Sequence, residues 1–276
     1  MDKLLFSVVL VWMVVICRAA EELGPFSYEV LTDTVKRLCD GHPGLCKLSI
    51  AQEVYNLPSP GMCGAKKDIP CTTQILHITN FSTYEQEKKT RPQVYMSGEL
   101  HGDERVGPHA VVELAKILLE SENPWIRRLV NTRSILLTPI TNSIGFDRNT
   151  REENSIDPNR DYPIDQASSG CMKAIASRIA NEIYRTHMIQ LAITFHGGME
   201  AIAMEWGTKS RVEMSKHKSP DDFALLQLGG GLSSYAGPVD HNGRPYPIGR
   251  MNDLVYPVEG GSKYFMLFEL KETLTT

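Results

Sequence analysis

The segment Gly98-Glu99-Leu100-His101-Gly102-Asp103-Glu104-Arg105 says more about the fold and chemistry of this chain than any other. It places a histidine and a carboxylate three residues apart, flanked by glycine. Further along, a strand-like run at 191–195 ends in a second histidine, His196, before a pair of glycines. Two imidazoles and one carboxylate are a set that holds zinc and leaves a fourth position for water or substrate. The sequence therefore predicts a zinc site formed by His101, Glu104 and His196, the alternative being a surface loop and an ordinary strand-end histidine.

Strand-like and helix-like segments alternate around these residues. Apolar periodicity and end signals predict strands at 47–55, 72–80, 94–97, 134–139 and 191–195, and helices at 26–39, 124–130 and 172–187 and beginning near Pro108 and Ser219. The glycines at 229–231 are expected at a helix end or turn, because neither a preceding strand nor a following Gly-Lys-Ser/Thr supports a phosphate loop. Alternation of this kind indicates an α/β protein with helices on both faces of a sheet. Without a repeat or linker, one domain is the simplest interpretation.

The first residues have the features of a secretory signal peptide. A charged start leads into an apolar run of 14 residues, Leu4 to Cys17, and then into small residues at Ala19-Ala20. The run is short for a membrane span, which needs about 20 residues. We therefore expect residues 1–19 to be removed, leaving a secreted or lumenal protein with residues 20–276 as one domain and no membrane span.

Charge and cysteine content narrow the class further. Without Lys3, Arg18 and Asp2 the chain carries 27 basic and 32 acidic residues, a formal charge of −5, which gives no case for a nucleic-acid partner. Five cysteines then remain, and the close pairs Cys39/Cys46 and Cys63/Cys71 could each bridge a local loop, although other pairings are open. Cys171 would be left over. Asn80-Phe81-Ser82 is an N-glycosylation sequon.

A polar cluster, Arg151 to Asp161, lies between the two parts of the predicted metal site. It contains two arginines, and an arginine fork matches a carboxylate with two parallel hydrogen bonds. The alternative is an exposed loop of mixed charge. The chain has neither a GxSxG nor an HExxH motif, which argues against a serine hydrolase and a thermolysin-like protease.

Five ordered motifs resemble the M14 zinc metallocarboxypeptidases. They are the His-Gly-Asp-Glu run at 101–104, the Asn-Ser-Ile-Gly-Phe run at 142–146, the Asn159-Arg160 pair, the Phe-His-Gly-Gly run at 195–198, and the tyrosine segment from Tyr246 to Gly261. The resemblance implies a single α/β domain with a mixed central sheet and helices on both faces. It also implies one Zn²⁺ per chain and release of single C-terminal residues from peptides or proteins.

The resemblance further assigns roles to individual residues. Arg151 would polarise the scissile carbonyl, Asn159 and Arg160 would bind the terminal carboxylate of the substrate, and Tyr256 would cap that carboxylate. Glu269, in the run Phe-Glu-Leu at 268–270, would act as the general base for the zinc-bound water.

The chain departs from the family pattern near its C-terminal end. Only 13 positions separate Tyr256 from Glu269, and the Asp-Trp-Tyr stretch expected after the double glycine is absent. Residues 262–276 are therefore expected to be an atypical or truncated form of this region. Two alternative functions stay open: a zinc N-acyl-amino-acid deacylase that shares the metal set, and a secreted zinc-binding pseudoenzyme that does not turn over.

Overall fold

The computed structural model describes residues 26–163, 168–208, 210, 218–240, 242–262 and 268–272. The predicted signal peptide, residues 1–19, lies outside the described residues, as does most of the tail at 262–276. Within that tail the structure describes Ser262 and the backbone of the strand at 268–272.

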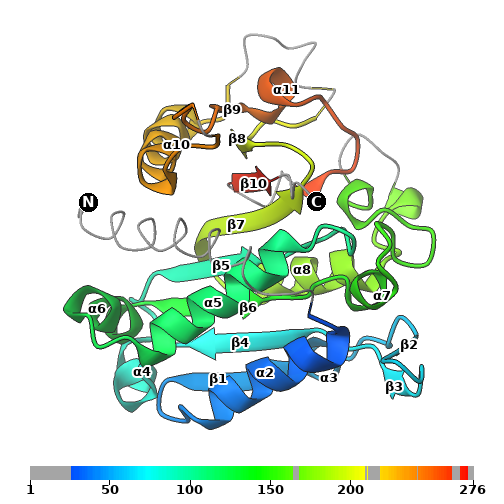
Figure 1. Cartoon of the computed structure of the whole chain (residues 1–276), viewed down its shortest axis with the longest axis vertical. Helices are drawn as coiled ribbons and strands as arrows, with labels where there is room; N and C mark the ends of the chain where they lie inside the picture. Colours follow the sequence, from blue (N-terminus) through cyan, green and yellow to red (C-terminus); the bar gives the residue numbers. More distant parts are fainter. Residues whose placement is uncertain are drawn as a thin grey trace.

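A mixed sheet of eight strands forms the centre of the described structure (Figure 1). The strands are β1 (Cys46–Ile50), β4 (Gln74–Ile78), β5 (Gln93–Ser97), β6 (Ser134–Thr138), β7 (Ile189–Gly197), β8 (Ala201–Met204), β9 (Ile248–Arg250) and β10 (Phe268–Glu272). Their spatial order is β1-β4-β6-β5-β7-β10-β8-β9. The four neighbouring strands β6, β5, β7 and β10 run parallel to one another. At the two ends of this group, β6 pairs with β4 and β10 pairs with β8, both antiparallel. The mixed sheet confirms the predicted fold class.

Helices cover both faces of this sheet (Figure 1). They are α2 (Tyr28–Asp40), α3 (Ala51–Val54), α4 (Phe81–Glu87), α5 (Val106–Glu120), α6 (Pro124–Thr132), α7 (Ser143–Arg148), α8 (Ile175–Thr186), α10 (Asp222–Ala236) and α11 (Met251–Leu254). Side chains of α2, α5, α6 and α10 contribute to one apolar core, and those of α8 contribute to a second. Adjacent strand residues enter different cores: Tyr95 packs with α8, and Met96 packs with the helices on the other face. This alternation follows from the two-residue period of a strand.

Two expected elements differ from the structure. The strand predicted at 47–55 ends at Ile50, and α3 follows. In α3 the buried side chain of Gln52 accepts a hydrogen bond from Thr73 N at 3.0 Å. The glycines at 229–231 lie inside α10, not at a helix end or turn. Gly229 packs so closely on the sheet that a Cβ there would lie 2.6 Å from Cγ2 of Ile248. The missing side chain thus allows the helix to approach the sheet.

Two disulfides join the close cysteine pairs, Cys39 to Cys46 and Cys63 to Cys71, as one of the open pairings predicted. Cys171 belongs to neither bridge.

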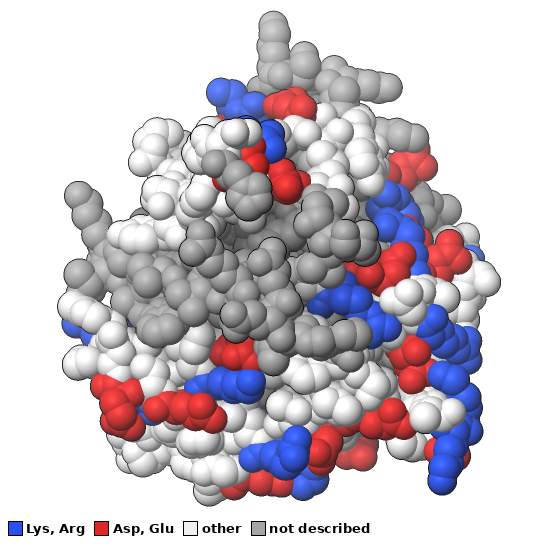
Figure 2. All heavy atoms as spheres, viewed as in Figure 1, with Lys and Arg blue, Asp and Glu red and all other residues white. Residues whose placement is uncertain are grey.

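Acidic and basic side chains are interspersed on the face drawn in Figure 2. Within the described residues, no helix combines the length and apolar character needed to cross a membrane.

Candidate metal centre

Two neighbouring strands carry the three predicted metal ligands to one edge of the sheet. β5 ends at Ser97 and leads into the loop that holds His101 and Glu104, while His196 lies near the end of β7. The strands are parallel, with Ser97 paired to Thr194, so their C-terminal ends reach the same edge. Gly102 permits the loop's tight path, since a Cβ there would overlap the backbone of Gly145 in α7.

The three side chains converge although His196 lies 92 residues from Glu104 in sequence. One ligand atom from each lies within 4.8 Å of the others. Nδ1 of His101 is 2.9 Å from Oε1 of Glu104, Nδ1 of His196 is 2.7 Å from Oε2, and the two Nδ1 atoms are 3.1 Å apart. Donor atoms at about 2.0–2.1 Å from a tetrahedral zinc stand about 3.3 Å from one another. The donor set and its spacing therefore fit a zinc ion.

The burial and ionisation of these three side chains also suit the binding of a cation. His101 and His196 are each 2% exposed, and Glu104 is half-buried. Burial by itself raises the pKa of Glu104, but its hydrogen bonds and charge interactions with the two histidines outweigh burial and hold that pKa far below its usual range. Glu104 is therefore a carboxylate at neutral pH, as a metal ligand must be.

Asp157 is a functional candidate that the sequence analysis did not identify. Its Oδ1 lies 3.0 Å from Nε2 of His101, and its Oδ2 accepts a hydrogen bond from Nε of Arg151 at 3.0 Å. Burial opposes ionisation, but His101, Arg151 and Arg160 together keep the pKa of Asp157 well below the ordinary value. A carboxylate on the outer nitrogen of a ligand histidine fixes the ring and its tautomer. The available sequence signal was its place in the polar cluster, two residues before Asn159.

Arg151 lies directly beside the metal-ligand group. Besides its contacts with Asp157, its Nη1 is 3.3 Å from Oε1 of Glu104, and its side chain is 38% exposed. The guanidinium thus lies next to a predicted ligand and is still accessible to solvent on one side.

Asn159 and Arg160 follow on a single 3-10 turn, Pro158–Arg160. Asn159 is buried, and its Nδ2 lies 3.4 Å from Nε2 of His196. Nη1 of Arg160 donates to the backbone oxygen of Asn159 at 2.7 Å. The structure therefore brings Asn159 up to a predicted metal ligand, with Arg160 bonded to the backbone of Asn159.

For Tyr256 and Glu269 the structure gives the position in the fold. Tyr256 lies on the segment after α11 and is 45% exposed. This segment is attached to the rest of the fold by a hydrogen bond from Val258 N to the backbone oxygen of Gly207 at 2.9 Å. The backbone of Glu269 lies in β10, between β7 and β8, and pairs with Thr194, two residues before His196. Glu269 thus belongs to the strand next to the one that carries a predicted ligand.

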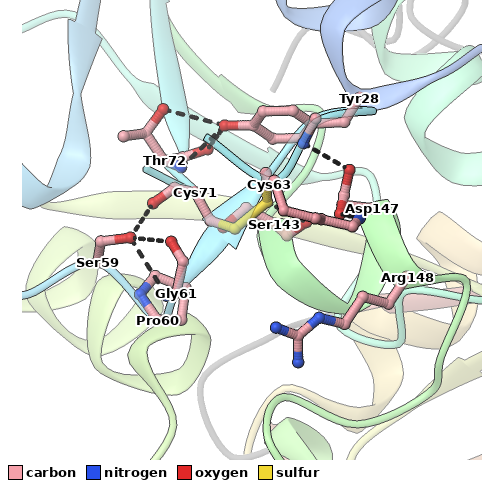
Figure 3. The surroundings of a disulfide bond; sticks show 12 residues. Tyr28, Ser59, Pro60, Gly61, Cys63, Cys71, Thr72, Ser143, Asp147 and Arg148 are labelled. Carbon is pink, nitrogen blue, oxygen red and sulfur yellow. Dashed lines mark hydrogen bonds and ion pairs between the residues drawn. A yellow bond between two sulfur atoms is a disulfide. The ribbon is translucent and has the colours of Figure 1, made fainter. Parts of the chain in front are cut away.

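A disulfide-closed hairpin braces the segment that leads to Arg151 (Figure 3). The hairpin, β2 (Met62–Cys63) and β3 (Ile69–Pro70), packs on α7. Sγ of Cys63 lies 3.6 Å from the backbone oxygen of Ser143, and Gly64 N donates to Asp147 at 2.9 Å. After α7, Nδ2 of Asn154 donates to the backbone oxygen of Pro60 at 2.8 Å. The hairpin and the residue Pro60 just before it therefore contact the chain on both sides of the turn that carries Arg151.

Comparison with known proteins gives consistent matches. Residues 72–273 match the Peptidase_M14 family model, described as zinc carboxypeptidase. Mouse carboxypeptidase M is 26% identical over 193 residues, covering 62% of this chain and 43% of that protein. Rat carboxypeptidase A2 is 24% identical over 269 residues, covering 81% and 61%. The chain thus spans less than two thirds of either relative.

Solved structures show the same fold. Carboxypeptidase A from Helicoverpa armigera superposes with a TM-score of 0.72 at 14% identity, covering 91% of this chain and 65% of that one. Bovine thrombin-activatable fibrinolysis inhibitor, solved with a tick carboxypeptidase inhibitor, superposes with a TM-score of 0.66 at 14% identity, covering 90% and 86%.

Proposed function

The chain belongs to the M14 family of zinc carboxypeptidases, and from this premise we propose that it hydrolyses the C-terminal peptide bond of peptides or proteins, releasing one amino acid at a time. The observation that carries the proposal is the convergence of His101, Glu104 and His196 within 4.8 Å, with Arg151 and Asp157 in contact with them. Neither family membership nor the shared fold requires this chain to keep that arrangement.

Zinc is the cofactor that the donor set favours, with His101, Glu104 and His196 as its ligands and Asp157 orienting His101. When bound, zinc polarises a carbonyl and lowers the pKa of a bound water to about 7. Arg151 would add a positive charge where the scissile carbonyl oxygen becomes negative. Such a donor is typically worth about 10²–10³ in kcat.

The free end of the substrate would be recognised beside the metal. Asn159 offers an amide donor next to His196, and Arg160 offers a guanidinium beside Asn159. A carboxylate binds such donors, and its hydrogen bonds to them are charge-assisted. Tyr256 would close over the bound end from its exposed segment. A peptide anchored in this way presents its last amide bond to the metal side of the site.

Glu269 is proposed as the general base. A carboxylate in this strand, beside β7, would accept a proton from the attacking water and pass it to the nitrogen of the leaving amino acid. Transfer of this kind contributes about 10²–10⁴ in rate.

Secretion and domain organisation are part of the same proposal. Two disulfides in one chain are typical of proteins that fold in an oxidising compartment. We propose that residues 1–19 direct the chain into that compartment and that residues 20–276 form one catalytic domain with an atypical region at 262–276.

The proposal is tested with zinc-loaded protein and three substrates: a peptide with a free C-terminus, the same peptide with a C-terminal amide, and an N-acyl amino acid. Carboxypeptidase action predicts release of the last residue from the first alone. Glu269→Gln should lower kcat by at least about 10², whereas Glu85→Gln, on the exposed side of α4, should not. Preferred cleavage of the N-acyl amino acid would favour a deacylase, and stoichiometric zinc without turnover would favour a pseudoenzyme.

A further inference from the structure

Ser262 makes two hydrogen bonds to one atom of the predicted carboxylate-binding pair. Its backbone N and its Oγ both donate to Oδ1 of Asn159, each at 2.8 Å. Ser262 is fully buried and Asn159 is 2% exposed, so water does not compete for these bonds. The contact joins positions 103 residues apart in the chain.

This contact determines which way the Asn159 amide faces. A backbone N–H can only donate, so the atom of Asn159 opposite Ser262 N must be the carbonyl oxygen. The amide nitrogen then lies on the other side, 3.4 Å from Nε2 of His196. Rotating the amide by half a turn would place its NH₂ group against the N–H of Ser262 and remove both hydrogen bonds.

The backbone around Ser262 holds this geometry in place. Tyr162 N donates to the backbone oxygen of Gly260 at 2.9 Å, which joins the same two segments a second time. A Cβ on Gly261 would lie 2.8 Å from Cγ2 of Val258, so this turn packs closely against the segment that follows Tyr256. The hydroxyl of Ser262 is therefore delivered to Asn159 by a backbone with little room to move.

We propose that Ser262 is a positioning residue that fixes the Asn159 side chain so that its NH₂ group faces the terminal carboxylate of the substrate. The proposal rests on the proposed function and deepens it, because it assigns the discrimination between a carboxylate and an amide to an atom outside the carboxylate-binding pair. A carboxylate accepts from the fixed NH₂ group. A C-terminal amide can present its own NH₂ group to the same place, where two donors face one another.

The predicted effect is confined to binding of the free C-terminus. Ser262→Ala removes the Oγ bond and leaves the N–H bond, so the amide is held less firmly but the fold is kept. One hydrogen bond of this kind corresponds to a change of about threefold to tenfold in an equilibrium constant. We expect KM for a free-acid peptide to rise by about that factor with kcat unchanged, since the lost contact is made equally in the ground and transition states.

The experiment compares wild type, Ser262→Ala, Ser262→Thr and Ser233→Ala. Threonine keeps the hydroxyl and should restore KM. Ser233, in α10, is also a buried serine, and its Oγ donates a hydrogen bond to the backbone oxygen of Tyr246 at 2.9 Å. Its substitution therefore controls for the loss of any buried hydroxyl. Calorimetric dissociation constants for N-acetyl-phenylalanine and its C-terminal amide, measured on the zinc-loaded proteins, complete the set.

The outcomes separate this inference from the proposed function. Weaker binding of the acid with unchanged binding of the amide in Ser262→Ala, restored in Ser262→Thr, supports the role of Ser262 even if wild type hydrolyses no peptide. Unchanged binding of the acid in Ser262→Ala overturns the inference while leaving peptidase activity standing. Equal losses for acid and amide, or a lower kcat, would assign Ser262 a general structural role. A wild type that neither cleaves nor binds the acid overturns both.

Discussion

His77 is a single residue through which the protein should sense acid. It lies on β4, and its Nε2 contacts Oγ of Ser134 at 2.9 Å. Burial, together with the nearby His187, Lys47 and Arg91, lowers the pKa of His77 to about 4. Between pH 6.5 and 4 the unfolded chain therefore binds a proton that the folded protein does not, and stability falls as the pH is lowered through this window.

His77→Gln should reduce this acid sensitivity. The shift of the His77 pKa corresponds to about 3 kcal/mol across the window, of which about 2 kcal/mol is lost between pH 7 and pH 5. Urea unfolding at these two values should show a larger loss for wild type than for the variant, because groups common to both proteins cancel. Between pH 7 and pH 8 the two curves should run parallel. An identical loss in both proteins at pH 5 would contradict the prediction.

Asp157 shows what residue-level sequence reasoning could not supply. The three candidate metal ligands were predicted because histidine and glutamate at a fixed spacing have a known chemistry. Asp157 acts on His101 from 56 positions away, and only folding establishes that contact. The contact of Ser262 was not predicted for the same reason: a serine after two glycines carries no local signal of its hydrogen bonds to Asn159.

The disulfide-closed hairpin β2–β3 is an element with two separable effects. The Cys63–Cys71 and Cys39–Cys46 bridges span 8 and 7 positions, so the loss of chain entropy on closing either loop is similar. Replacing either pair with alanine should lower the free energy of unfolding by about 2–3 kcal/mol. The Cys63–Cys71 bridge lies against α7, where Sγ of Cys63 is 3.6 Å from the backbone oxygen of Ser143 (Figure 3). Pro60, just before the hairpin, accepts a hydrogen bond from Asn154 in the turn that carries Arg151.

Activity should therefore distinguish the two alanine pairs. Loss of the Cys63–Cys71 bridge should reduce kcat/KM by about tenfold, because small displacements of a positioned arginine are costly for catalysis. The Cys39–Cys46 variant, which frees the link between α2 and the edge strand β1, should keep wild-type kcat/KM below its melting temperature. Equal losses of kcat/KM in both variants would show that the hairpin has no particular role at the site.

Adjacent glycines in α10 offer a matched test of how that helix packs on the sheet. A methyl group at Gly230 meets no atom within 4 Å, so Gly230→Ala should stabilise the protein by up to about 1 kcal/mol through helix propensity. A methyl group at Gly229 would press on Ile248 at 2.6 Å and Met204 at 3.3 Å. Gly229→Ala should therefore be destabilising by about 1–2 kcal/mol. Chemical denaturation measures both, and a stabilising Gly229→Ala would contradict the close packing.

Elements with strong periodicity were predicted well, whereas short or context-dependent ones were not. The helices at 28–40 and 106–120 and the strands at 93–97 and 134–138 lie where their apolar patterns indicated. β8 and β9 were not predicted, because four and three residues are too few for a period to appear. α3 contacts Thr73, and Gly229 in α10 packs against Ile248, and neither partner belongs to the local sequence of its helix.

At the scale of the whole molecule, the candidate metal site brings together residues from β5, from β7 and from the segment before α8. His101 and Glu104 follow β5, His196 belongs to β7, and Asp157 and Asn159 reach the same place from the segment before α8. The segment is held to α8 by Glu153, which accepts from Ala176 N at 2.9 Å, and by Asp161, which accepts from Ala174 N at 2.8 Å. A ligand bound only by the folded arrangement stabilises all of these parts at once.

Zinc should therefore raise the melting temperature of the entire domain, not only support its chemistry. Free zinc at about 100 times its dissociation constant contributes about 2.7 kcal/mol, or about 5–10 °C for a domain of this size. Chelation should reverse the shift in a calorimetric scan. His196→Ala should abolish it, since two ligands from one loop no longer connect β5 to β7, while His42→Gln, near the end of α2, should retain it. A shift of the same size in His196→Ala would mean that zinc stabilises the protein from a different place.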